Sequence, residues 1–153
     1  MHKPTNTTTK PKNRNKFTVP IFPHLKKFIL KNYKVSEPVK TEDYTTLGKM
    51  VSLALRDNRM LSDNNDQLRD RLKSTLTIML SKQQADLGPR LGKLIRINTN
   101  MDLIFKEHLL CWIDALKKDG IPVNTACKMF LEHYDIDEKE YSLDAAYKLY
   151  QRR

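Results

Sequence analysis

Two histidines and two cysteines carry side chains that can bind zinc. His108 and Cys111 are three residues apart, and Cys127 precedes His133 by six residues. Imidazole and thiolate groups are the usual zinc ligands. However, Cys127 falls on an apolar helical stripe, whereas His133 follows Glu132 near the polar edge, and structural zinc sites normally take close ligand pairs from loops. The sequence therefore favours two core cysteines and two surface histidines, with no metal site.

Acidic residues suggest a second kind of chemistry, which is metal-dependent hydrolysis. They occur in close pairs, such as Asp63 with Asp66 and Glu138 with Glu140. Solvated faces of mixed charge explain these pairs more simply. The sequence has no P-loop, GxSxG motif, HExxH motif or glycine-rich dinucleotide turn. We therefore predict no enzyme, no catalytic residue and no cofactor.

Positive charge is concentrated at the beginning of the chain. Residues 1–40 contain nine lysines and one arginine against Glu37 alone, and so hold nine of the ten net positive charges. Residues 1–16 have Met1 as their only apolar side chain, which is too little buried surface to offset the entropy of ordering. The sequence predicts a disordered basic arm over residues 1–16. Such an arm favours a polyanionic partner, because each neutralised phosphate releases condensed counterions.

Residues 17–153 are predicted to form a single small domain, with possible sub-units at 17–73 and 74–153. Pro20 restricts the extended segment 17–21 to the edge of a sheet. Pro23 fits the first turn of a helix whose apolar side includes Phe28. Residues 35–43 form a linker, a second apolar helical stripe runs from Leu47 to Leu55, and residues 57–71 form a loop or a short exposed helix.

Two short segments then resemble β-strands. Apolar residues alternate with their neighbours at Leu76, Ile78 and Leu80, and again at Ile95 and Ile97. Gly88, Pro89 and Gly92 lie between them. The pattern predicts an antiparallel hairpin over about 75–97, with a mobile tip that carries Arg90 and Lys93. This tip is either a nucleic-acid contact or a solvated loop that joins two strands.

The last third of the chain has the clearest helical pattern. It predicts three helices over residues 100–153, with Trp112 and Phe130 as the largest apolar side chains on two adjacent stripes. Gly120 and Ser142 are suited to end and to begin helices. In the last helix, the predicted inward residues are Leu143, Ala146, Tyr147 and Tyr150. The fold class is therefore α+β and mainly helical.

This C-terminal unit resembles a helix-turn-helix DNA-binding module. The features that carry the resemblance are the small Ala126, the large apolar Phe130 and Leu131, a turn with Ile136 and a final helix that ends in basic residues. In that family the last helix lies in the major groove, which implies base or phosphate contacts for Lys148, Gln151 and Arg152. The turn over residues 135–141 is longer and more acidic than the family's turn. The alternative is that the last helix only completes a three-helix bundle.

The combined features predict a non-enzymatic nucleic-acid-binding protein, with double-stranded DNA favoured over RNA. The arm and the first helix supply phosphate contacts, and the hairpin tip or the last helix sets orientation. The predicted contact residues are Lys3, Lys10, Lys12, Arg14, Lys16, Lys26, Lys27, Lys31, Arg90, Lys93, Lys148, Gln151 and Arg152. The chain is also similar in overall style to small basic accessory proteins of bacteriophages and bacterial mobile elements. The alternative function is a structural or interaction protein, such as a phage virion component or an assembly adaptor, whose arm binds an acidic protein surface.

The sequence contains no apolar stretch of the kind that predicts an association with membranes. No run approaches the ~20 residues needed to span a bilayer, and residues 1–15 lack the apolar core and cleavage site of a secretory signal. The basic helix over residues 22–34 is of a kind that can lie on an anionic membrane, but a core-packed helix is favoured because no second anchor exists. We expect a cytoplasmic protein, located in a host cytoplasm or in a virion, without a membrane partner.

Overall fold

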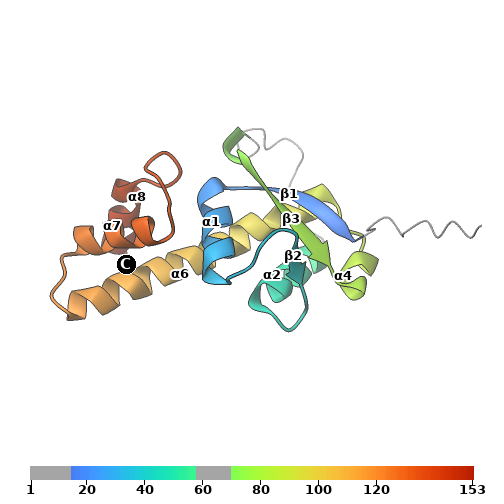
Figure 1. Ribbon diagram of the computed structural model, residues 1–153, viewed down its shortest axis with the longest axis horizontal. Coiled ribbons are helices and arrows are strands. Elements are labelled where there is room, and N and C mark those ends of the chain that lie inside the picture. Colours follow the sequence, from blue (N-terminus) through green and yellow to red (C-terminus); the bar gives the residue numbers. More distant parts are fainter. Residues whose placement is uncertain (1–14, 58–69) are drawn as a thin grey trace, which may run out of the picture.

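A computed structural model describes residues 15–57 and 70–153. Residues 1–14 of the predicted arm and residues 58–69 of the predicted loop or short helix lie outside this description. The fold is α+β and mainly helical, as the sequence predicts (Figure 1). Its elements are β1 (Lys16–Ile21), α1 (Pro23–Asn32), β2 (Val39–Thr41), α2 (Thr46–Arg56), β3 (Ser74–Leu80), α4 (Lys82–Asp86), α5 (Leu91–Leu94), α6 (Arg96–Lys118), α7 (Val123–His133) and α8 (Leu143–Gln151).

The three strands form a mixed sheet in the order β1–β3–β2. β1 is antiparallel to β3, with Thr18 opposite Thr77, and β2 runs parallel to β3, with Val39 opposite Ile78. Pro20 therefore lies on an edge strand, which confirms the prediction. β2 lies inside the segment that the sequence predicts to be a linker, so this strand was missed.

The predicted hairpin over residues 75–97 is wrong. Its first strand exists as β3, but β3 pairs with β1 and β2, and the residues of its second strand lie in α5 and α6. The apolar residues near Ile95 fit a helix equally well, because Leu94, Ile97, Met101 and Phe105 recur at intervals of three and four and are all buried. Arg90 is consequently the N-cap residue of α5 rather than part of a hairpin tip.

Two charged side chains complete the sheet edge beside β2. β2 pairs only with the last three residues of β3, so the first part of β3 has no strand partner on this side. There Lys26 Nζ donates to the carbonyl of Thr75 at 2.7 Å, and Glu37 Oε1 accepts from the N–H of Thr77 at 2.7 Å. The two side chains also form an ion pair at 3.0 Å. The hydrogen bond from Thr77 is the main cause that lowers the pKa of Glu37.

A single amide completes the opposite edge at the end of β1. Asn98 is almost fully buried in the first turn of α6. Its Oδ1 accepts from the N–H of Phe22 at 3.0 Å, and its Nδ2 donates to the carbonyl of Pro20 at 2.9 Å. α6 is thereby attached to β1 by the two hydrogen bonds that a neighbouring strand would otherwise supply.

A buried glutamine holds β2, α2 and α4 together. Gln84 Oε1 accepts from the Thr41 hydroxyl at 2.7 Å and from the N–H of Ser81 at 3.0 Å. Its Nε2 donates to the carbonyl of Gly48 at 3.1 Å and to the Ser52 hydroxyl at 3.0 Å. Because its hydrogen-bonding capacity is filled, the buried amide fixes the position of β2, and with it the outward direction of Lys40.

The helix α6 runs the length of the molecule and joins its two halves (Figure 1). The sheet, α2 and α5 lie along its first half, and α7 and α8 pack on its second half. Phe105, in the middle of α6, is fully buried, and its ring lies 5.0–5.5 Å from those of His24, Phe28, Phe130 and Tyr141. One continuous apolar core therefore runs through both halves.

The three predicted C-terminal helices form, but α6 begins at Arg96 rather than near residue 100, and one predicted orientation is wrong. Gly120 ends α6 at a φ of 81°, a conformation that glycine adopts without strain. The Ser142 hydroxyl accepts from the N–H of Ala145 and caps α8. Trp112 and Phe130 are in contact, with ring centroids 5.7 Å apart. Tyr147, which the sequence places inward, is exposed.

Candidate nucleic-acid interface

The sheet has one covered face and one open face. The covered face carries Val19, Ile21, Leu76, Ile78 and Leu80, all buried against the helices. Positions that alternate with these residues form the open face. Four residues of this face are exposed, namely Lys16, Thr18, Lys40 and Thr75. Three are half-buried, namely Pro20, Thr77 and Met79.

Two lysines flank the central strand of the open face. In the register of the sheet, Met79 stands opposite Lys16 on β1 and opposite Lys40 on β2. Because neighbouring strands are about 4.8 Å apart, the backbones of the two lysines are separated by about 10 Å. Neither lysine has a carboxylate partner within the part of the chain that the structure describes. Both lysines are also exposed, so their positive charges are accessible to a partner.

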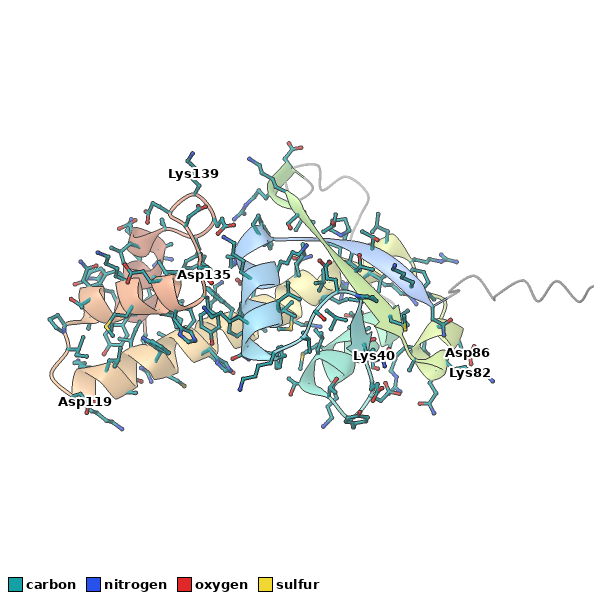
Figure 2. All side chains as sticks on the ribbon, in the orientation of Figure 1. Lys40, Lys82, Asp86, Asp119, Asp135 and Lys139 are labelled. Carbon is teal, nitrogen blue, oxygen red and sulfur yellow. The ribbon has the colours of Figure 1, made fainter. Side chains whose placement is uncertain are left out.

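The predicted arm enters the fold beside these two lysines. The carbonyl of Asn15 accepts from the N–H of Leu80 at 2.8 Å, so the last residue before β1 is paired with the end of β3. α4 follows β3 directly and lies beside this end of β1 (Figure 1). It carries Lys82 and Asp86, both exposed (Figure 2). We call Lys16, Lys40 and Lys82 the basic end of the sheet.

The open face carries no aromatic side chain. Its outward positions are lysine, threonine, proline and methionine, and Phe17 belongs to the alternating set on the covered side. Sheets that bind single-stranded nucleic acids stack the bases on exposed aromatic rings. A surface of hydroxyl and ammonium groups is instead suited to contact phosphate oxygens.

The three lysines of α1 that the sequence assigns to phosphate are paired within the protein. Lys26 is bound to Glu37 and Thr75, as described above. Lys27 Nζ lies 2.7 Å from Glu140 Oε2 and 2.6 Å from the carbonyl of Asp135. Lys31 Nζ lies 3.2 Å from Asp135 Oδ2. The acidic turn between α7 and α8 is thus held against the basic helix α1.

The predicted contacts on α8 lie far from the basic end. Lys148 forms an ion pair with Asp144 at 2.7 Å, and Gln151 and Arg152 are exposed. α8 packs near one end of α6 and the sheet lies near the other (Figure 1). At 1.5 Å per residue, a helix of this size is about 34 Å long. The structure therefore does not bring Lys148, Gln151 and Arg152 close to the basic end of the sheet.

The structure also separates Arg90 and Lys93 from the open face. Arg90 is exposed before α5, and Lys93 is half-buried within it. α5 packs against α2 and α6, on the covered side of the sheet. Of the predicted contact residues that the structure describes, only Lys16 belongs to the basic end. The sequence did not indicate Lys40 as a contact residue, because the strand β2 was not predicted.

The side chains considered for zinc are not arranged as ligands. Within residues 15–57 and 70–153, no group of three or more histidine, cysteine, aspartate or glutamate side chains could hold a metal ion. Cys127 is buried, and burial raises the pKa of its thiol, whereas Cys111 is exposed. The His133 ring packs against Trp112 and Tyr134.

A cavity of about 780 Å³ lies where the two halves of the molecule meet. We call it the junction cavity, and its lining includes Phe22, His24, Thr99, Asp102, Lys106 and Tyr141. Burial raises the pKa of the Asp102 carboxyl, but His24 and Lys106 outweigh this effect and lower it overall. Sequence reasoning did not find this site, because its residues come from distant segments and form no local motif.

Tyr141 is expected to resist ionisation at alkaline pH. Burial, followed by the charges of Asp102 and Cys127, raises its pKa from 10.0 to about 12. The protonated phenol of Tyr141 contributes to the stability of the fold, because its folded-state pKa lies above the unfolded value. This contribution is complete below about pH 10 and is lost as the pH rises towards 12. Absorbance titration at 295 nm should show that Tyr141→Phe removes the last tyrosine to ionise. If Tyr141→Phe instead removed a component that titrates near pH 10, the buried position of Tyr141 would be contradicted.

Comparisons with known proteins yield no match: no family model, curated protein or solved structure is similar to this chain. Among the described helices, none combines the length and apolar character needed to cross a membrane.

Proposed function

We propose that this protein binds double-stranded DNA, without catalysis, through its basic arm and the basic end of its sheet. The proposal depends mainly on one observation. The arm joins the fold next to Lys16 and Lys40, two outward lysines whose charges have no carboxylate partner among the described residues. Arm and sheet therefore present one continuous source of positive charge to a polyanion.

Phosphate contact explains how these groups act together. Each lysine that neutralises a phosphate releases counterions, which favours binding without a base-specific contact. The hydroxyls of Thr18 and Thr75 are exposed on the same face and can donate hydrogen bonds to phosphate oxygens. The lack of aromatic side chains on this face favours a duplex, whose bases remain stacked, over a single strand.

The sheet replaces the hairpin tip and the last helix as the element that sets orientation. The hairpin does not form, and the positive charge of Lys148 on α8 is offset by Asp144. Groove reading by α8 is the competing mechanism.

Reversing the two charges of the open face should separate these mechanisms. We expect Lys16→Glu with Lys40→Glu to weaken binding of a random duplex by about 10- to 100-fold at low salt, because two attractions become repulsions. The matched control is Lys49→Glu with Lys118→Glu, which changes the net charge equally at exposed positions on α2 and α6. The control should change affinity by less than about threefold. Fluorescence anisotropy with labelled DNA measures both.

Three outcomes would overturn the proposal. Equal losses in the test and control variants would show that only net charge matters. Loss of binding in Gln151→Ala with Arg152→Ala, but not in the open-face variant, would identify α8 as the contact element. A wild-type protein that binds no duplex DNA, but is retained by an acidic protein surface, would favour the structural or adaptor function.

A further inference from the structure

We propose that the junction cavity binds a phosphate monoester group, carried either by a free nucleotide or by the end of a nucleic-acid strand. This inference does not depend on DNA binding by the open sheet face. The cavity volume of about 780 Å³ lies within the range of small-molecule sites. Its lining combines aromatic rings with charged groups, as such sites commonly do.

Each carboxylate of the cavity is already engaged. Asp102 lies 2.5 Å from Lys106 Nζ, and Glu140 lies 2.7 Å from Lys27 Nζ. Asp137 Oδ1 accepts from the backbone N–H groups of Lys139 and Glu140, at 2.9 and 3.2 Å. Of the three, only Asp137 keeps a negative charge that no neighbouring cation offsets.

Three cationic side chains of the lining have no carboxylate partner among the residues that the structure describes. They are Arg71, Lys73 and Lys139. The guanidinium of Arg71 packs over the Phe22 ring at 5.4 Å. Lys139 stands at the tip of the turn between α7 and α8 (Figure 2). Among the described residues of the lining, unpaired positive charge thus exceeds unpaired negative charge, which favours an anion.

A buried histidine forms part of the cavity wall. His24 is 6% exposed, and neither of its ring nitrogens has a hydrogen-bond partner among the described residues. Its Nε2 lies 3.9 Å from Asp102 Oδ1, which is longer than a hydrogen bond. Buried polar groups are normally hydrogen-bonded, so these two nitrogens are an exception within a residue of the cavity wall.

The charge of the site favours a terminal phosphate over a phosphodiester chain, because a monoester carries up to two negative charges and an internal phosphodiester carries one. The phosphate would meet the three cations, and an attached sugar or base would lie against Phe22 and Tyr141. Three cations are also suited to the two negative charges of a monoester.

The first test uses AMP, with adenosine as the probe that lacks the phosphate. Isothermal titration of the full chain at low salt should show saturable binding of AMP, at least about tenfold tighter than that of adenosine. Competition with a short 5′-phosphorylated oligonucleotide, but not with its 5′-hydroxyl form, would assign the site to strand ends. Competition by neither oligonucleotide would assign it to free nucleotides. Absence of saturable AMP binding would overturn the proposal.

The second test adds a negative charge to the wall at Thr99, which is exposed and lines the cavity. Thr99→Glu should weaken AMP binding by at least about tenfold, whereas the neutral Thr99→Gln should stay within about threefold of wild type. Lys139→Ala, in the exposed turn, should weaken AMP binding without lowering the melting temperature. Equal AMP affinities in the Glu and Gln variants would overturn the proposal. Duplex DNA binding by both variants should remain unchanged, which separates this site from the open sheet face.

Discussion

Replacing Phe105 with alanine is expected to lower the free energy of unfolding by about 3–5 kcal/mol. Phe105 is fully buried at the middle of α6 and packs against aromatic rings from both halves of the molecule. Its removal leaves a cavity at the point where α1, α7 and the turn before α8 meet. Because the whole stability of a small domain is commonly 5–15 kcal/mol, this single change would remove a large share.

Urea unfolding followed by circular dichroism measures this loss. Leu103→Ala is the matched control, since Leu103 lies on the same helix and is 60% exposed. It should change the free energy by less than about 0.5 kcal/mol. A loss below about 1 kcal/mol for Phe105→Ala would show that the aromatic cluster is not a packed junction.

Deleting residues 1–14 is expected to flatten the salt dependence of DNA binding. The segment holds Lys3, Lys10, Lys12 and Arg14, and each phosphate contact contributes about 0.9 to the slope of log affinity against log salt. The slope should therefore become shallower by about 3 to 4 units. Asn15 and Lys16 are kept because they pair with β3. Anisotropy titrations over a series of salt concentrations measure the slope.

A full-length variant with glutamine at these four positions separates charge from length. It should reproduce the shallow slope of the deletion, and both proteins should melt within about 2 °C of wild type, because Met1 is the only apolar side chain in this segment. A deletion that keeps the wild-type slope would remove the arm from the mechanism. A steep slope in the glutamine variant alone would show that length, not charge, is responsible.

Features governed by local chemistry could be predicted from the sequence. Pro20 on an edge strand, Pro23 in the first turn of α1, Gly120 after α6 and Ser142 before α8 all occupy the expected positions. Each depends on the backbone requirements of one residue and its near neighbours. The apolar stripes of the long helices are equally local, because the 3.6-residue turn of the helix sets their period.

Features governed by distant contacts could not be predicted. β2 has only two buried positions, Val39 and Thr41, and becomes a strand because β3 lies beside it. Near Ile95, the buried polar side chain of Asn98 interrupts the apolar pattern of α6, since it bonds to β1 far away in sequence. Lys26, Lys27 and Lys31 appeared free for phosphate because their acidic partners lie in other segments.

The side chains that complete the sheet edges also limit self-association. A strand edge with unpaired N–H and C=O groups is a template for a second chain, and proteins with uncovered edges are prone to aggregate. Here Lys26 and Glu37 occupy one edge, Asn98 occupies the other, and Pro20 has no N–H to offer. The remaining edge of β1 begins at a charged residue, Lys16. The sheet can thus leave one face open to a partner while these parts of its edges resist the addition of further strands.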